Sequence, residues 1–253
     1  MEKNAQAVNF FKKVGPLVAI WLLITFLLSP FILLYVQIGN LDFPASDELI
    51  WCLQNTTIQA SGSAVFSLLF GIWGAAGLLS LKKEKWRLFW EVVFLLPNFV
   101  PPLFVVLAIF KTVEPFPIGL VGLIFVHSFI NAGLVAVLLA RIVDQKVGPL
   151  VELALIEGAG RFQFARVILR MLRLDLVLLF LLIFSICFMS FSIPLLAGGD
   201  QGTTLEVLIF EKVRLSSQWN QALGISFLQC VFLFIFSLVA PQETKTVKRE
   251  KRN

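Results

Sequence analysis

Six apolar stretches, each about the length of a transmembrane helix, dominate this sequence. They run approximately over residues 14–38, 56–81, 88–110, 118–140, 174–196 and 219–240. The hydrocarbon core of a bilayer needs roughly 20 predominantly apolar residues per helix. Inside lipid, backbone N–H and C=O groups must be hydrogen-bonded within the protein, which favours helices for such stretches. We therefore predict an all-α membrane protein with six transmembrane helices, in which residues 1–253 form a single transmembrane domain.

The composition agrees with this prediction and excludes a separate soluble domain. Hydrophobic residues make up 58% of the chain and charged residues 15%, against about 45–50% and about 25% in soluble proteins. No stretch of soluble-type composition approaches the ~50 residues that a domain needs. The first apolar stretch is longer than the apolar core of a signal peptide, about 7–15 residues, and has no A-x-A-like cleavage site, so we expect a retained span.

The second stretch, 56–81, is rich in small residues, including Gly62, Gly71, Gly74 and Gly77. Because packing rather than hydrophobicity drives helix association in lipid, small residues mark the surfaces where helices approach closely. This pattern predicts that the second helix lies in the centre of the bundle.

The distribution of Lys and Arg predicts the orientation in the membrane. Of 21 basic residues, all but Lys111, Lys212 and Arg214 lie in the N-terminus, 82–87, 141–173 or the C-terminal tail. Cytoplasmic segments carry the excess of Lys and Arg, so we expect these four segments, and both termini, in the cytoplasm. Topology thus explains the net charge of +5 without nucleic acid. Glu91 and Asp175 lie near cytoplasmic span ends, and we expect them to pair with basic residues nearby.

The stretch 141–173 is the longest interval between predicted spans. It has a helical first half, a Gly158–Gly160 break and a basic second half. Two interpretations remain open from these residues: a segment that docks onto a partner protein, or an amphipathic helix at the membrane surface with snorkelling arginines.

This stretch resembles the cytoplasmic EAA loop of permease subunits in bacterial ABC importers. Glu152, Leu153 and Ala154 stand for the E-A-A of the pattern, and Gly158 lies at the matching distance. Ile168 meets the pattern's isoleucine, whereas Arg170 and Met171 stand where the family has Leu-Pro, so the end of the loop helix is not defined by the pattern.

A second resemblance covers 188–214, FMSFSIPLLAGGDQGTTLEVLIFEKVR. It is similar to the end of span five and the following loop in permeases of the ferric-iron and thiamine group. The resemblance implies the six-helix fold of type I importers, with ferric iron or thiamine as substrate; polyamine, molybdate, sulfate and phosphonate stay open. It also implies a loop facing a substrate-binding protein, at Gly198, Gly199, Thr203 and Thr204, for which an ordinary flexible loop is the alternative.

The family resemblance further implies the partners of the chain. A coupling helix would contact an ATPase through Glu152, Ala154, Gly158, Ala159, Arg161 and Phe162. The chain has no G-x-x-x-x-G-K-[ST] motif, so ATP and Mg would bind to a partner ATPase dimer. A second permease unit, identical or different, and a periplasmic or extracellular binding protein would complete an importer in the bacterial inner membrane.

Polar residues within spans are candidates for the translocation path, because they are costly in lipid and often functional. We single out the following: Asn98, His127, Asn131, Ser190 and Ser192. The alternative for each of them is a hydrogen bond between helices.

Other functions fit the sequence less well. A single His, no H-E-x-x-H and no G-x-S-x-G argue against an intramembrane enzyme, and three Cys without C-x-x-C spacing indicate no metal site. We therefore expect no catalytic residues and no cofactor on this chain. An ion-coupled secondary transporter usually shows inverted repeats, which are not evident here. That transporter and a non-enzymatic membrane scaffold remain the alternatives.

Overall fold

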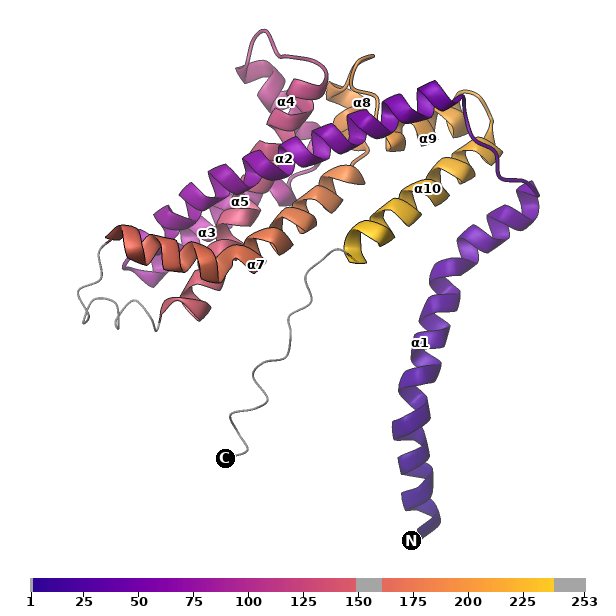
Figure 1. Cartoon of the computed structure of the whole chain (residues 1–253), viewed down its shortest axis with the longest axis horizontal. Coiled ribbons are helices and arrows are strands. Elements are labelled where there is room, and N and C mark those ends of the chain that lie inside the picture. Colours follow the sequence, from indigo (N-terminus) through magenta and orange to yellow (C-terminus); the bar gives the residue numbers. More distant parts are fainter. Residues whose placement is uncertain (1, 149–160, 239–253) are drawn as a thin grey trace.

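The computed structural model describes residues 2–148 and 161–238, and within these ranges every regular element is a helix. The all-α prediction is confirmed. The helices are α1 (Glu2–Ile38), α2 (Ser46–Ser80), α3 (Glu84–Phe99), α4 (Pro102–Thr112), α5 (Leu120–Lys146), α7 (Arg161–Phe188), α8 (Ser192–Ala197), α9 (Leu205–Arg214) and α10 (Trp219–Leu238) (Figure 1).

The described helices give five candidate membrane spans, or six if α3 and α4 count as one bent span. The five are 16–38, α2, α5, 166–188 and α10. The expected third span, 88–110, is not straight, because α3 and α4 meet at an angle of 99°. Val100 and Pro101 are extended, with ψ angles of 137° and 131°. The break follows from the sequence Pro101-Pro102, since a residue before proline avoids the helical conformation and proline donates no N–H.

The basic connection between the expected fourth and fifth spans is also organised differently. Helix α5 continues to Lys146, and α7 begins at Arg161 and runs without a break to Phe188. The basic residues from Arg161 to Arg173 therefore belong to the first turns of the membrane helix itself. At its other end, the expected fifth span of 174–196 is divided, because α7 ends at Phe188 and the short helix α8 follows.

Helix α2 lies in the centre of the bundle, as its small residues predict. It packs side by side with α5 and also contacts α7, α3 and α9 (Figure 1). A Cβ atom on Gly71 would overlap the side chain of Val135, and one on Gly74 would lie 2.7 Å from Cβ of Ala136. The two backbones can approach this closely only because the side chains between them are absent or small.

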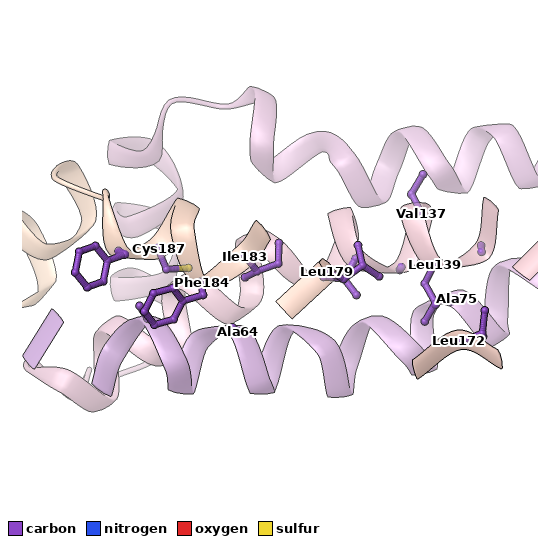
Figure 2. Packing of buried hydrophobic residues seen from close by; sticks show 14 of the residues in the cluster. Ala64, Ala75, Val137, Leu139, Leu172, Leu179, Ile183, Phe184 and Cys187 are labelled. Atoms are coloured by element: carbon purple, nitrogen blue, oxygen red, sulfur yellow. The ribbon is translucent and has the colours of Figure 1, made fainter. Parts of the chain in front are cut away.

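Helix α7 closes the core against this central pair. Figure 2 shows buried side chains of α2, α5 and α7 in one cluster, including Ala64, Leu139, Leu179 and Ile183. Aromatic rings continue the packing to α10: the tilted rings of Phe184 and Phe236 lie 4.2 Å apart between centroids, and the stacked rings of Phe188 and Phe232 lie 4.8 Å apart. Helix α1 leads away from this bundle and approaches α10 at one end (Figure 1).

The close contact between α2 and α5 predicts opposite effects for one substitution at two glycines of α2. Gly71→Ala overpacks the contact with Val135 and should lower stability by about 1–3 kcal/mol. Gly77→Ala is the matched control, because a Cβ atom there meets nothing within 4 Å; it should stabilise by about 0.5–1 kcal/mol, since Ala favours a helix. Thermal unfolding in detergent measures both. A Tm for Gly71→Ala at or above that of Gly77→Ala would contradict the packing described here.

Candidate functional site

A buried polar cluster joins α2, α5 and α7, and it contains two of the expected path residues, His127 and Asn131. Both are only 2% exposed. The Asn131 side-chain amide donates to the His127 carbonyl at 2.9 Å and lies 3.5 Å from Cys187 Sγ. In the described chain these two residues therefore lie between helices and do not face an open passage.

Gln59 of α2 anchors the end of α7 in this cluster. Its Nε2 donates to the Cys187 carbonyl at 2.7 Å, one of the last carbonyls of α7, which have no partner within their own helix. Gln59 is not among the expected path residues. A signal was present, because Thr56, Gln59, Ser63 and Ser67 recur at helical spacing in an apolar span and all four are buried.

The other three expected path residues are more accessible. Asn98 donates to the Ile130 carbonyl at 2.9 Å and so joins α3 to α5, while its residue as a whole is exposed. Ser190 is partly exposed between α7 and α8, and Ser192, the first residue of α8, is exposed. Two of the five candidates are thus buried between helices and three are at least partly exposed, and the structure does not bring the five together in one site.

Two hollows of the described structure have mostly apolar linings. A cavity of about 430 Å³ lies between α2, α3 and α5, and a second of about 670 Å³ lies at the bend between α3 and α4. Pro97, Phe125 and Phe129 line both cavities. The expected path residues are polar, and none of the five lines either cavity. The proline cluster between 97 and 102 was the available signal.

The loop that was expected to face a binding protein is tied to α2 by hydrogen bonds. Asn55 donates from its amide to the carbonyls of Gln201 and Thr203, at 3.3 Å each. The backbone N–H of Leu205, at the start of α9, donates to Thr56 Oγ1 at 2.9 Å. These bonds hold the part of the loop from Gln201 to Leu205 against α2.

The four expected contact residues in this loop differ in exposure. Gly199 is exposed and has a φ of +54°, a conformation that glycine adopts readily. Thr203 is partly exposed, whereas Gly198 and Thr204 are buried. Only the tip of the loop, from Gly199 to Gln201, therefore offers a continuous exposed surface.

Two polar contacts hold α9 beside this loop. Lys212 pairs with Glu48 of α2 at 2.9 Å, and Gln229 of α10 donates to Glu206 Oε1 at 2.7 Å. Burial raises the pKa of the Glu206 carboxyl, and the hydrogen bond from Gln229 opposes that rise.

Ion pairs gather at the opposite end of the bundle, which we call the basic end (82–87, 141–146 and the first turns of α7). Glu91 of α3 accepts from Arg141 at 2.9 Å and from Arg87 at 3.3 Å, and Arg87 also pairs with Asp144. Lys146 pairs with Asp175 of α7 at 2.7 Å. The expectation that Glu91 and Asp175 meet nearby basic residues is confirmed.

Most of the expected coupling residues cannot be placed at either end of the bundle. Glu152, Ala154, Gly158 and Ala159 lie outside the described residues. Arg161 and Phe162 form the helical start of α7, and their side chains also lie outside the description. Among the described residues, no three His, Cys, Asp or Glu side chains are grouped in a way that could hold a metal ion.

The comparisons with known proteins agree with this architecture. The family model described as binding-protein-dependent transport system inner membrane component matches residues 67–242, from α2 to the end of α10. The thiamine transport system permease protein ThiP of Brucella abortus is 27% identical over 222 residues, which are 79% of this chain and 41% of the relative. ThiP of Haemophilus influenzae is 33% identical over 125 residues, or 48% of this chain and 23% of the relative. The matches thus cover between about a quarter and two fifths of the length of these curated relatives.

Solved structures show the same fold at low sequence identity. A bacterial ABC transporter involved in the import of the acidic polysaccharide alginate superposes with a TM-score of 0.70 and 16% identity, over 93% of this chain and 96% of that one. The same TM-score is found for a bacterial alginate ABC transporter in complex with an alginate pentasaccharide-bound periplasmic protein. The family match covers more than half of the chain and includes α5, α7 and the connection between them. With its several apolar spans, the chain is a multi-pass inner-membrane protein that belongs to the family of binding-protein-dependent transport system inner membrane components, the permeases of ABC importers.

Proposed function

We propose that this chain is one of two permease units in an ATP-driven importer and forms half of its translocation path. The family match over residues 67–242 carries this proposal. It extends through every described helix from the middle of α2 to α10, and it includes the connection that resembles an EAA loop. The importer fold over 93% of the chain supports it.

The ATPase partner binds at the basic end, which faces the cytoplasm. The excess of Lys and Arg at this end supports the orientation. Helix α5 ends at Lys146 and α7 begins at Arg161, and the sequence between them carries the Glu152–Gly158 pattern. Because the chain has no P-loop motif, ATP and Mg bind to the partner, and the connection transmits the movement of the ATPase to the spans.

The substrate-binding protein docks at the other end of the bundle. The exposed residues Gly199, Asp200 and Gln201 lie at the tip of a loop whose second half is hydrogen-bonded to Asn55 and Thr56. Because hydrogen bonds join the loop to α2, the docking of a substrate-loaded binding protein at the tip can displace α2, the central helix.

Thiamine is the substrate that we favour over ferric iron. The thiamine permeases among the relatives first suggest it. The lining of the two cavities adds a physical reason, because it includes Phe70, Phe94, Phe125 and Phe129 but no Asp, Glu or His. Aromatic faces attract organic cations through cation–π interactions, and the thiazolium ring of thiamine is such a cation. Ferric ion instead prefers hard oxygen or imidazole ligands.

The proposal predicts that the chain co-purifies with an ATPase subunit through the connection 147–160. Gly158→Trp should abolish co-purification, because a bulky side chain blocks the close approach or sharp turn that glycine permits there. Gly77→Trp, at an exposed position with open space around it, is the control and should retain the ATPase. The ATPase recovered per permease is the measurement. ATP-independent transport by the purified chain would contradict the proposal.

The substrate proposal predicts an effect of Phe129→Ala on thiamine transport. Phe129 lines both cavities, and loss of one exposed cation–π contact, about 0.5–1 kcal/mol, should lower the transport rate at low thiamine roughly two- to fivefold. Uptake of radiolabelled thiamine into proteoliposomes with the ATPase and binding protein measures this. Phe66→Ala, a phenylalanine of α2 that lines neither cavity and is similarly exposed, should have no effect. ATP hydrolysis stimulated by ferric ion and not by thiamine would identify the other substrate.

A further inference from the structure

Two sets of ion pairs lie on opposite sides of the last turns of α5. On one side, Arg141 and Asp144 pair with Glu91 and Arg87 of α3. On the other side, Lys146 pairs with Asp175 of α7, with its Nζ at 2.7 and 3.0 Å from the two carboxylate oxygens. Residues three apart share a face of a helix, whereas Lys146, at about 3.6 residues per turn, points away from that face. Helix α5 therefore joins α3 to α7 at this level.

In the pairs Glu91–Arg141 and Asp175–Lys146, the acidic side chain is buried and the basic side chain reaches the surface. The side chains of Glu91 and Asp175 are each 9% exposed, whereas those of Arg141 and Lys146 are 58% and 40% exposed. A buried carboxylate without its partner is costly, so each acid holds its partner helix in place. A contact of this kind opposes sliding or separation of the helices more strongly than a pair in open solvent.

The positions of these pairs relate them to the connection between α5 and α7. Lys146 is the last residue of α5, and Asp175 lies about 20 Å along α7 from Arg161, at ~1.5 Å per residue. The residues that flank the segment 147–174, which contains the entire EAA-like connection, thus form an ion pair with each other. Displacement of that segment reaches the bundle at this pair as well as through Val147 and Leu172, which are buried in the core.

We propose that these contacts form a clamp that makes α3, α5 and α7 move as one body when the ATPase displaces the connection. The clamp consists of Lys146–Asp175 on one side of α5 and of the network Arg87, Glu91, Arg141 and Asp144 on the other. This inference rests on the proposed function. Helix α3 carries Phe94 and Pro97 in the cavity walls, so the clamp delivers the movement to the surface that the substrate passes. The clamp residues are positioning residues and do not touch the substrate.

Asp175→Asn tests the clamp in the complete transporter, reconstituted in proteoliposomes. ATP hydrolysis and transport of radiolabelled thiamine are measured on the same vesicles. We expect hydrolysis to persist while the amount transported per ATP falls about tenfold, which corresponds to about 1.4 kcal/mol of lost coupling. The fold should survive, because the remaining Lys146 side chain reaches solvent. Arg141→Gln, at the most exposed member of the other pair, is a second variant with the same expected uncoupling.

Two controls make the test specific to pairing. Glu114→Gln removes the ion pair with Lys111, which lies away from the basic end and in which both side chains are mostly exposed. This variant should leave the amount of thiamine transported per ATP unchanged. The double exchange Lys146→Asp with Asp175→Lys restores the pair in reverse and should recover at least half of the lost coupling. A merely structural role would lower assembly and hydrolysis together, and that result would overturn the clamp.

The outcomes separate this inference from the proposed function. Wild-type protein that transports with ATP, together with an unchanged ratio in Asp175→Asn or an exchange that restores nothing, would overturn the clamp alone. Absence of ATP-driven transport by the wild-type assembly would overturn the proposed function, and the clamp with it.

Discussion

The close contact between α2 and α5 is the constraint on which the rest of the structure depends. Gly71 and Gly74 let the two backbones meet with almost no side chain between them, and α7 and α3 then pack on the pair so formed. Association in lipid gains little from hydrophobicity, because the surrounding chains are as apolar as the helices. Close packing of complementary helix surfaces and a few hydrogen bonds between helices must therefore hold the bundle together. The glycines of α2 make this close packing possible.

Sequence predicted the elements better than it predicted their limits. Apolar length gave the helices, since composition alone decides whether a stretch can reside in lipid. It could not show that the arginines from Arg161 to Arg173 belong to α7, because basic residues in an otherwise apolar chain look like an aqueous connection. It also missed the 99° turn between α3 and α4. Pro101-Pro102 marked a break there, but the direction of a break depends on what the following helix packs against.

In the candidate site, too, some features could be predicted from the sequence and others could not. Charge pairing was predictable for Glu91 and Asp175, because buried acids near a membrane surface need basic partners. The path residues chosen by polarity stay a prediction: Asn131 hydrogen-bonds between helices, whereas the two cavities are lined by Pro97, Phe125 and Phe129. A polar group in lipid must first satisfy its own hydrogen bonds, so its presence in a span says little about which side of the helix faces a passage.

The unbroken course of α7 has a geometric consequence. Its 28 residues form a rod about 40 Å long. Gln59 and the stacked rings of α10 hold one end, near Cys187 and Phe188. Leu172, Leu179 and Ile183 are buried along the rod, so α7 is held along its packed face and not only at this end. A rod packed in this way cannot bend or slide alone, and a force applied near Arg161 is shared with the helices on which α7 packs.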